Sequence, residues 1–265
     1  MTSDTTLRSP RDVARTMLNK VPEVTLFFWV IKILATTVGE TAADYLNDTL
    51  GFGLTWTTVV MTVVTVVLLF VQFRTRAYVA PVYWAVVVFI SVVGTLITDN
   101  LTDRFGVPLP LSTAVFAVLL AVTFALWYRS ERTLSIHTIV TTRRESWYWL
   151  AILVTFALGT AAGDLVGEQL NLGYGVSVLI FAAAIALVTI AHLGFKANAV
   201  LCFWLAYILT RPLGASIGDL MSQSHKHGGL GLGTTGTSAL FLSAILVLVG
   251  YLTATRVDRT EVQTL

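Results

Sequence analysis

The chain alternates between long apolar stretches and short polar connections over almost its whole length. Each apolar stretch is long enough for a helix to cross the roughly 30 Å hydrocarbon core of a bilayer. The eight stretches fall at residues 24–46, 54–73, 79–101, 110–128, 147–169, 174–194, 199–221 and 237–255. Because a helix satisfies its own backbone polar groups in lipid, the pattern predicts an all-α, polytopic membrane protein with eight transmembrane helices.

Composition supports a membrane location. Of the 265 residues, 55% are hydrophobic and 12% are charged, whereas soluble domains carry about 25% charged residues. The polar N-terminal segment leads directly into a full-length apolar stretch, so we expect no cleaved signal peptide. The single cysteine, Cys202, excludes an intramolecular disulfide.

The distribution of lysine and arginine predicts the orientation. Thirteen of the 17 basic residues lie in the two termini and in connections of one parity, whereas the other connections hold only Arg104 and Lys226. Because cytoplasmic segments are enriched in basic residues, both termini are predicted to be cytoplasmic. We therefore expect a multi-pass protein of the cell (inner or plasma) membrane, in contact with the lipid bilayer.

A spaced set of three residues recurs four times along the chain. A tryptophan is followed by a glycine ten residues later and by an aspartate fifteen residues later. The tryptophans are Trp29, Trp84, Trp149 and Trp204, the glycines are Gly39, Gly94, Gly159 and Gly214, and the aspartates are Asp44, Asp99, Asp164 and Asp219. Two predicted helices belong to each copy, so the repeats enter the membrane from the same side and are related by an axis along its normal. The predicted units are 22–78, 79–143 (including a long cytoplasmic loop), 144–198 and 199–256, between an N-terminal tail at 1–21 and a C-terminal tail at 257–265.

Four tandem two-helix repeats, each with a characteristic tryptophan, resemble a family of bacterial integral membrane proteins built from a repeat of unknown function, domain family 347. The resemblance covers about residues 22–255. It implies the architecture described above and brings no established activity with it, so function is argued from the residues themselves.

The repeated tryptophans and glycines have structural explanations. The tryptophans are predicted to lie near the cytoplasmic ends of their helices, either as interfacial anchors or as packing residues. The glycines lie among other small residues and predict seams along which helix backbones approach closely in lipid.

The repeated acids are the main candidates for a site. Each aspartate lies about 17 to 20 residues into its helix, near the outer boundary of the membrane, where the helix dipole disfavours negative charge. We predict an ion- or substrate-binding site, with the same residues as metal ligands, formed by Glu40, Asp44, Asp99, Asp164 and Asp219. Oxygen ligands favour hard cations such as Mn²⁺, Mg²⁺ or Ca²⁺, or protons. The alternative, that the aspartates only mark the outer boundary, stays open.

Two basic residues fall inside predicted helices, and we assign them charge-pairing or gating roles. Arg211 lies near the middle of the bilayer, where an unpaired charge is costly, so Glu40 or a repeat aspartate is its expected partner. Lys32 is expected either to pair or to extend its amino group to the cytoplasmic interface.

These features favour a membrane transporter that moves a cation, either a hard divalent metal such as manganese or a proton-coupled ion. The first alternative is a proton-coupled carrier of a small organic solute, with Arg211 or Lys32 holding a substrate carboxylate. The second is a scaffold or sensor that transports nothing. No catalytic motif is present, so an enzyme is not expected, and a divalent metal is expected only as substrate, not as cofactor. Topology accounts for the basic residues, which leaves no support for a nucleic-acid partner. The oligomeric state stays open.

Overall fold

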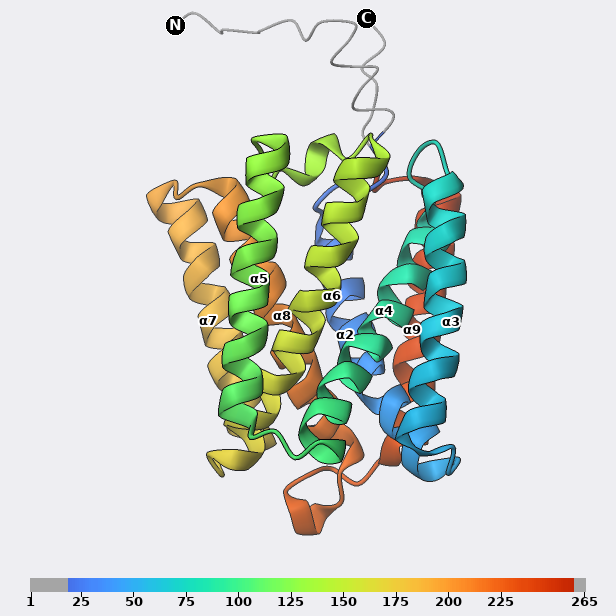
Figure 1. Cartoon of the computed structure of the whole chain (residues 1–265), viewed down its shortest axis with the longest axis vertical. Coiled ribbons are helices and arrows are strands. Elements are labelled where there is room, and N and C mark those ends of the chain that lie inside the picture. Colours follow the sequence, from blue (N-terminus) through green and yellow to red (C-terminus); the bar gives the residue numbers. More distant parts are fainter. Residues whose placement is uncertain (1–18, 260–265) are drawn as a thin grey trace, which may run out of the picture.

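The computed structural model describes residues 19–259, apart from the side chains of Glu168 and His227, and most of these residues are helical. The long helices are α2 (Leu26–Asp44), α3 (Gly53–Arg74), α4 (Ala80–Asp99), α5 (Leu109–Glu131), α6 (Thr142–Asp164), α7 (Tyr174–Phe195), α8 (Ala199–Ser222) and α9 (Gly233–Thr255). Within these described residues, eight helices are long and apolar enough to cross a membrane. The predicted all-α, polytopic architecture is therefore confirmed (Figure 1).

The largest differences from the predicted helix bounds lie at two N-termini. Helix α6 begins at Thr142 because the side chain of Thr141 caps it, accepting a hydrogen bond from the backbone N–H of Arg144 at 3.3 Å. Helix α9 begins at Gly233, before the apolar part of its sequence. The predicted long cytoplasmic loop is therefore shorter, and it contains the 3₁₀ helix η3 (Ile136–Thr138).

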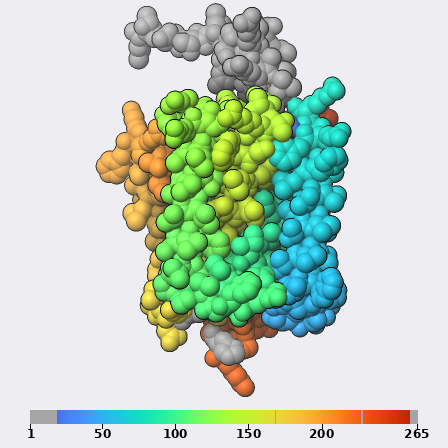
Figure 2. Space-filling model, viewed as in Figure 1, coloured from blue at the N-terminus to red at the C-terminus, as the bar shows by residue number. Residues whose placement is uncertain are grey.

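The eight helices form an inner ring and an outer set. Helices α2, α4, α6 and α8 form the inner ring, and between 56% and 72% of the residues in their most apolar segments are buried. In α3, α5, α7 and α9 the share is between 11% and 28%. Because apolar side chains cover the exposed faces of these outer helices, they are the surface that contacts lipid. In Figures 1 and 2, α3 (cyan) and α5 (green) stand on the outside, with α4 and α6 between them.

Each outer helix packs mainly on the inner helix of the next repeat. Helix α3 packs on α4, α5 on α6, α7 on α8, and α9 packs back on α2. The last of these contacts joins the fourth repeat to the first, so the arrangement is cyclic. Helix α2 accordingly packs on both α4 and α8, which closes the inner ring.

The two ends of the bundle differ in what they carry. Residues 19–25 and 256–259 lie together at one end, which we call the terminal end, because the backbone N–H of Glu23 donates to the carbonyl of Asp258 at 3.0 Å. The opposite end, the far end, carries the π-helical turns η1 (Tyr45–Thr49), η2 (Asn100–Arg104) and η4 (Leu165–Gln169), and the 3₁₀ helix η5 (His225–His227) (Figure 1).

The repeated glycines make the closest contacts of the inner ring. Each glycine faces the residue that lies seven positions after the tryptophan of the next repeat, and a Cβ atom at any of the four would overlap that residue. The pairs are Gly39 with Ser91, Gly94 with Phe156, Gly159 with Arg211, and Gly214 with Thr36. The predicted small-residue seams are therefore present, and they run around the ring as one cyclic set.

The repeated tryptophans form part of a second cyclic set, the aromatic layer, together with the residue before each of them. In every case the aromatic residue of one repeat contacts the tryptophan of the next. The ring centroids are 5.7 Å apart for Phe28–Trp84, 5.5 Å for Tyr83–Trp149, 6.2 Å for Tyr148–Trp204 and 5.7 Å for Phe203–Trp29. Three of the tryptophans are buried and Trp29 is partly buried. Packing between helices therefore accounts for Trp84, Trp149 and Trp204, whereas an interfacial role for the partly buried Trp29 stays a prediction.

Candidate functional site

A buried ion pair lies inside the inner ring. The Nη2 atom of Arg211 on α8 is 2.8 Å from Oε2 of Glu40 on α2, and the arginine side chain is fully buried. The same nitrogen donates to the hydroxyl oxygens of Thr160, at 2.7 Å, and Thr95. Nη1 donates to the carbonyl oxygen of Thr36 at 3.2 Å. The partner expected for Arg211 is therefore present, and one guanidinium contacts all four inner helices.

The repeat explains why these side chains meet. Glu40, Thr95 and Thr160 each lie eleven residues after the tryptophan of their repeat, and Ala215 holds this position in the fourth. Symmetry brings these equivalent positions to one level of the ring. Arg211 enters from the fourth helix at the level of Gly159, whose missing side chain leaves room for the arginine stem. We call Arg211, Glu40, Thr95 and Thr160 the charged layer.

The charged layer is costly to bury. Removing a guanidinium and a carboxylate from water costs several kcal/mol per ion, and their attraction offsets this only when further hydrogen bonds are made. The two threonine hydroxyls and the carbonyl of Thr36 supply those bonds, although Nε of Arg211 has no hydrogen-bond partner. A paired but expensive charge inside a membrane protein is more typical of a functional site than of a stabilising contact.

The surroundings of Lys32 differ from both expectations drawn from the sequence, an ion pair or an amino group at the cytoplasmic interface. Its side chain is fully buried, so its amino group does not extend to the membrane surface, and Nζ has no hydrogen-bond partner. Instead Nζ lies 4.2 Å from the ring centroids of both Phe156 and Tyr207. Charge pairing fails because Lys32 faces α6 and α8 two turns before Glu40, which is bonded to Arg211.

The repeat aspartates lie at the far end of the inner helices. Asp44, Asp99 and Asp164 are each the last residue of an α-helix that continues as a π-helical turn. Single π turns are frequent at functional sites because they redirect side chains. In the fourth repeat α8 runs on past Asp219, a buried residue, to Ser222 without such a turn.

Electrostatic repulsion acts between several of these acids. The carboxylate of Asp99 interacts with those of Glu40, Asp164 and Asp44, and with that of Asp103 in the following turn. Acids from the first three repeats therefore lie within electrostatic range of one another at the far end, and the predicted site stays a prediction. Side chains described for residues 19–259 nevertheless include no group of three or more His, Cys, Asp or Glu that could hold one metal ion. The assignment of Glu40 and the four aspartates as metal ligands stays a prediction.

Sequence reasoning missed the hydroxyl groups that complete the charged layer. Thr95 and Thr160 occupy the position of Glu40 in their repeats, and this alignment is the signal that identifies them. It also missed the polar contacts at the terminal end. There Lys20 pairs with Glu145, and the phenol of Tyr78 donates to the carboxylate of Asp258.

Comparison with known proteins identifies the family of the repeat. The family described as Repeat of Unknown Function (DUF347) matches residues 27–78, 82–133, 147–198 and 202–258. Neither a curated protein nor a solved structure matches the chain. The four matched segments contain the outer helices, all but the first one to five residues of each inner helix, and every residue of the charged layer. The chain therefore belongs to the DUF347 repeat family and carries four copies of its repeat.

Proposed function

We propose that this protein is a membrane transporter that moves a cation along the axis of the inner ring. Glu40 is the carboxylate that binds the cation, and Arg211 is a built-in cation that occupies Glu40 between transport cycles. One observation carries the proposal. Arg211 is fully buried, and its Nη2 atom contacts the equivalent residues of the three other repeats at once, Glu40 among them.

Exchange of Arg211 for an incoming cation keeps the carboxylate of Glu40 compensated. If Arg211 leaves Glu40 without a replacement, a buried carboxylate is uncompensated, which costs about 3–5 kcal/mol. An incoming cation that binds Glu40 removes this penalty, so binding and the movement of Arg211 are coupled. The carboxylate and the hydroxyls of Thr95 and Thr160 are oxygen ligands, which favour a hard cation such as Mn²⁺ or a proton-coupled ion.

The acids at the far end also favour a cation as the transported species. Asp44, Asp99 and Asp164 concentrate negative charge beside the charged layer, which raises the local concentration of cations and repels anions. With the termini in the cytoplasm, as the basic residues predict, this end faces outward. The aromatic layer encircles the axis toward the other end of the ring.

Ion flux into proteoliposomes tests the proposal, with Mn²⁺ and Mg²⁺ as separate probes. Glu40→Gln keeps the size of the side chain and one oxygen but removes its charge. We expect it to lower the flux of the transported ion at least tenfold while the protein stays folded in detergent. The matched control is Asp48→Asn, the same loss of charge at an exposed acid of the far end. Wild-type flux in Glu40→Gln would contradict the proposal.

Substitutions of the four repeat aspartates test the same proposal further. From the sequence alone Asp44→Asn is expected to weaken transport most, because its repeat carries the densest set of acids. The carboxyl of Asp99 lies within electrostatic range of those of Glu40, Asp164 and Asp44, so Asp99→Asn is an equally strong candidate. Flux measured at several pH values should fall several-fold in both variants. Full flux in all four Asp→Asn variants would leave the aspartates as boundary residues without a role in transport.

A second function, a proton-coupled carrier of a small organic anion, rests on Lys32. Two fully buried basic side chains, Lys32 and Arg211, share this part of the ring with Glu40, and the amino group of Lys32 has no hydrogen-bond partner. An anionic substrate would compensate it. In that case Lys32→Met abolishes uptake of an organic anion, and Glu40→Gln chiefly alters the pH dependence of uptake.

A further inference from the structure

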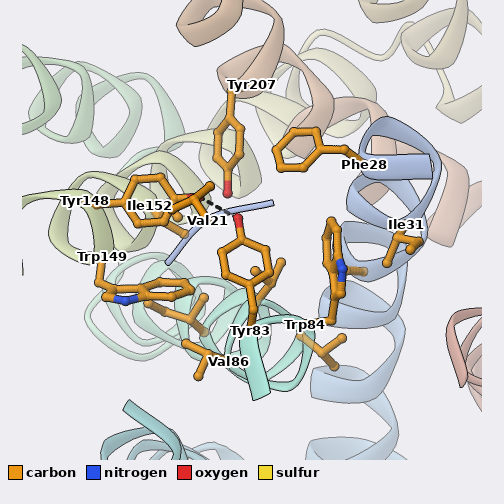
Figure 3. Packing of buried hydrophobic residues seen from close by; sticks show 14 of the residues in the cluster. Val21, Phe28, Ile31, Tyr83, Trp84, Val86, Tyr148, Trp149, Ile152 and Tyr207 are labelled. Atoms are coloured by element: carbon orange, nitrogen blue, oxygen red, sulfur yellow. Dashed lines mark hydrogen bonds between the residues drawn. The ribbon is translucent and has the colours of Figure 1, made fainter. Parts of the chain in front are cut away.

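The chain just before α2 lies across the terminal end of the inner ring. Residues 19–23, which we call the strap, include Val21, whose side chain is 3% exposed. Figure 3 shows Val21 beside Tyr83, Tyr148 and Tyr207, whose hydroxyl groups point toward one another. A segment expected to be a polar tail is thus inserted at the axis, directly over the aromatic layer.

Backbone hydrogen bonds tie the strap to three separate segments. The N–H of Lys20 donates to the carbonyl of Ile139 at 3.1 Å, in the connection between α5 and α6. The carbonyl of Asn19 accepts from the N–H of Tyr78 at 3.0 Å, between α3 and α4. The N–H of Glu23 donates to Asp258 at 3.0 Å, after α9. The strap therefore holds together two loops and the segment after α9 at this end of the ring.

A buried ion pair fastens the middle of the strap. Nζ of Lys20 lies 2.6 Å from Oε2 of Glu145 at the start of α6 and donates to the carbonyl of Phe73 at 3.1 Å. The amide of Gln72 donates to the other oxygen of Glu145 at 3.1 Å. Side-chain exposure is 8% for Lys20 and 1% for Glu145. Such a pair contributes little net stability but fixes one arrangement, because either partner alone would be left as a buried charge.

We propose that the strap is the gate of the terminal end, with Val21 as its plug and the Lys20–Glu145 pair as its latch. This inference rests on the proposed transport function, because an axial pathway must open at this end. The latch opens when Lys20 leaves Glu145, which frees residues 19–23 to move off the aromatic layer. The inner ring itself need not come apart, because its glycine and aromatic contacts do not include the strap.

Cysteine labelling tests the latch without knowledge of the transported ion. Val21→Cys is placed in a Cys202→Ala background, which contains no other cysteine, and reacted in detergent with a polar maleimide. We expect labelling at least tenfold slower than at Val257→Cys, an exposed control at the same end. Lys20→Ala should raise the labelling rate of Val21→Cys at least tenfold, whereas Lys20→Arg, which keeps the charge, should restore slow labelling. Fast labelling of Val21→Cys with Lys20 intact, or no effect of Lys20→Ala, would overturn the proposal.

A covalent lock tests whether the gate must open. A carbodiimide joins a paired amine and carboxylate as an amide, so it should link Lys20 to Glu145. Lys20→Arg keeps the ion pair but cannot form this link, which controls for modification of other acids. In proteoliposomes we expect treatment to lower Mn²⁺ flux at least tenfold more in the wild type than in Lys20→Arg. Equal flux after verified cross-linking would overturn the gate, whereas absence of flux in every untreated sample would instead contradict the transport function.

Discussion

The aromatic layer and the charged layer lie on the same four inner helices, about 16 Å apart along the helix axis. The four repeats are alike in the first layer and different in the second. In the aromatic layer every repeat makes the same contact with the next, and four copies close the ring. In the charged layer the equivalent positions hold different residues. Position seven after the tryptophan is Thr36, Ser91, Phe156 and Arg211, and position eleven is Glu40, Thr95, Thr160 and Ala215.

Electrostatics explains the difference. An apolar contact gains the same energy each time it is repeated, so packing residues keep the symmetry of the repeats. Four arginines or four glutamates at one level of the axis would repel one another strongly in a medium of low dielectric. One arginine that faces one glutamate and two hydroxyls avoids this repulsion. Function is therefore expected at the positions where the four repeats differ.

The largest expected effect comes from removing the asymmetric cation. Arg211→Ala leaves Glu40 buried without its partner, so we expect a loss of about 3–5 kcal/mol in the free energy of unfolding and loss of transport. Thermal unfolding in detergent and ion flux measure the two effects. Arg211→Met combined with Glu40→Leu should regain most of the stability but not the flux. A single Arg211→Ala variant with wild-type stability would show that the pair contributes nothing to folding.

The symmetric contacts give the next largest effect. Alanine at Gly39, Gly94, Gly159 or Gly214 inserts a Cβ where a neighbouring residue lies, and overpacking of this kind costs about 1–3 kcal/mol. We expect the largest loss of thermal stability for Gly159→Ala, because Arg211 cannot shift without weakening its bond to Glu40.

The control for this series is Gly250→Ala on α9, where a Cβ meets open space. It should leave stability unchanged or raise it by up to about 1 kcal/mol, since alanine is the better helix former. If the four ring variants matched Gly250→Ala, the inner ring would be packed more loosely than described.

The fold and the ion pair could be predicted from the sequence because each follows from a strong physical requirement. Apolar stretches of membrane length must be helices, and Arg211 inside one of them needs an acid, which Glu40 supplies. The surroundings of Lys32 could not be predicted, because spacing along one helix does not reveal which helices it faces. Phe156 and Tyr207 come from two other repeats.

The terminal end was unpredictable for a different reason. Lys20 belongs to a polar segment, and a basic residue before a first transmembrane helix is ordinarily read as a solvated orientation signal. Its burial depends on Glu145, 125 residues later in the chain. The role of the tryptophans was equally ambiguous, because packing and interfacial anchoring both place an aromatic residue near a helix end.

Substitution of Lys32 distinguishes the cost of burying its amino group from the stability gained by packing of its side chain. Lys32→Met replaces a buried amino group that has no hydrogen-bond partner by an apolar side chain of similar length. It loses the contacts of the amino group with the two rings, worth about 2 kcal/mol, but removes the cost, several kcal/mol, of burying an amine that has no hydrogen-bond partner. We therefore expect equal or higher thermal stability, with altered transport. A melting temperature several degrees below that of the wild type would show that the rings of Phe156 and Tyr207 outweigh the burial cost.

The smallest expected effect concerns Asp258, which anchors the strap through its backbone and accepts a hydrogen bond from the phenol of Tyr78. Burial raises the pKa of Asp258 above its ordinary value of 3.8 and outweighs the hydrogen bond from Tyr78, which acts in the opposite direction. The folded protein therefore holds this proton more tightly than the unfolded chain does. Its contribution to stability is fully present below the unfolded pKa and is lost as the pH rises through the raised pKa.

Asp258→Asn cannot ionise and should lack this pH dependence, while its side-chain carbonyl still accepts the hydrogen bond from Tyr78. We expect the variant and the wild type to melt together near pH 4 in detergent. The variant should gain about 1–2 °C relative to the wild type by pH 7. A variant that is instead less stable at pH 7 would show that the charged hydrogen bond between Tyr78 and Asp258 outweighs burial. The anchor of the strap would then tighten, not loosen, as Asp258 ionises.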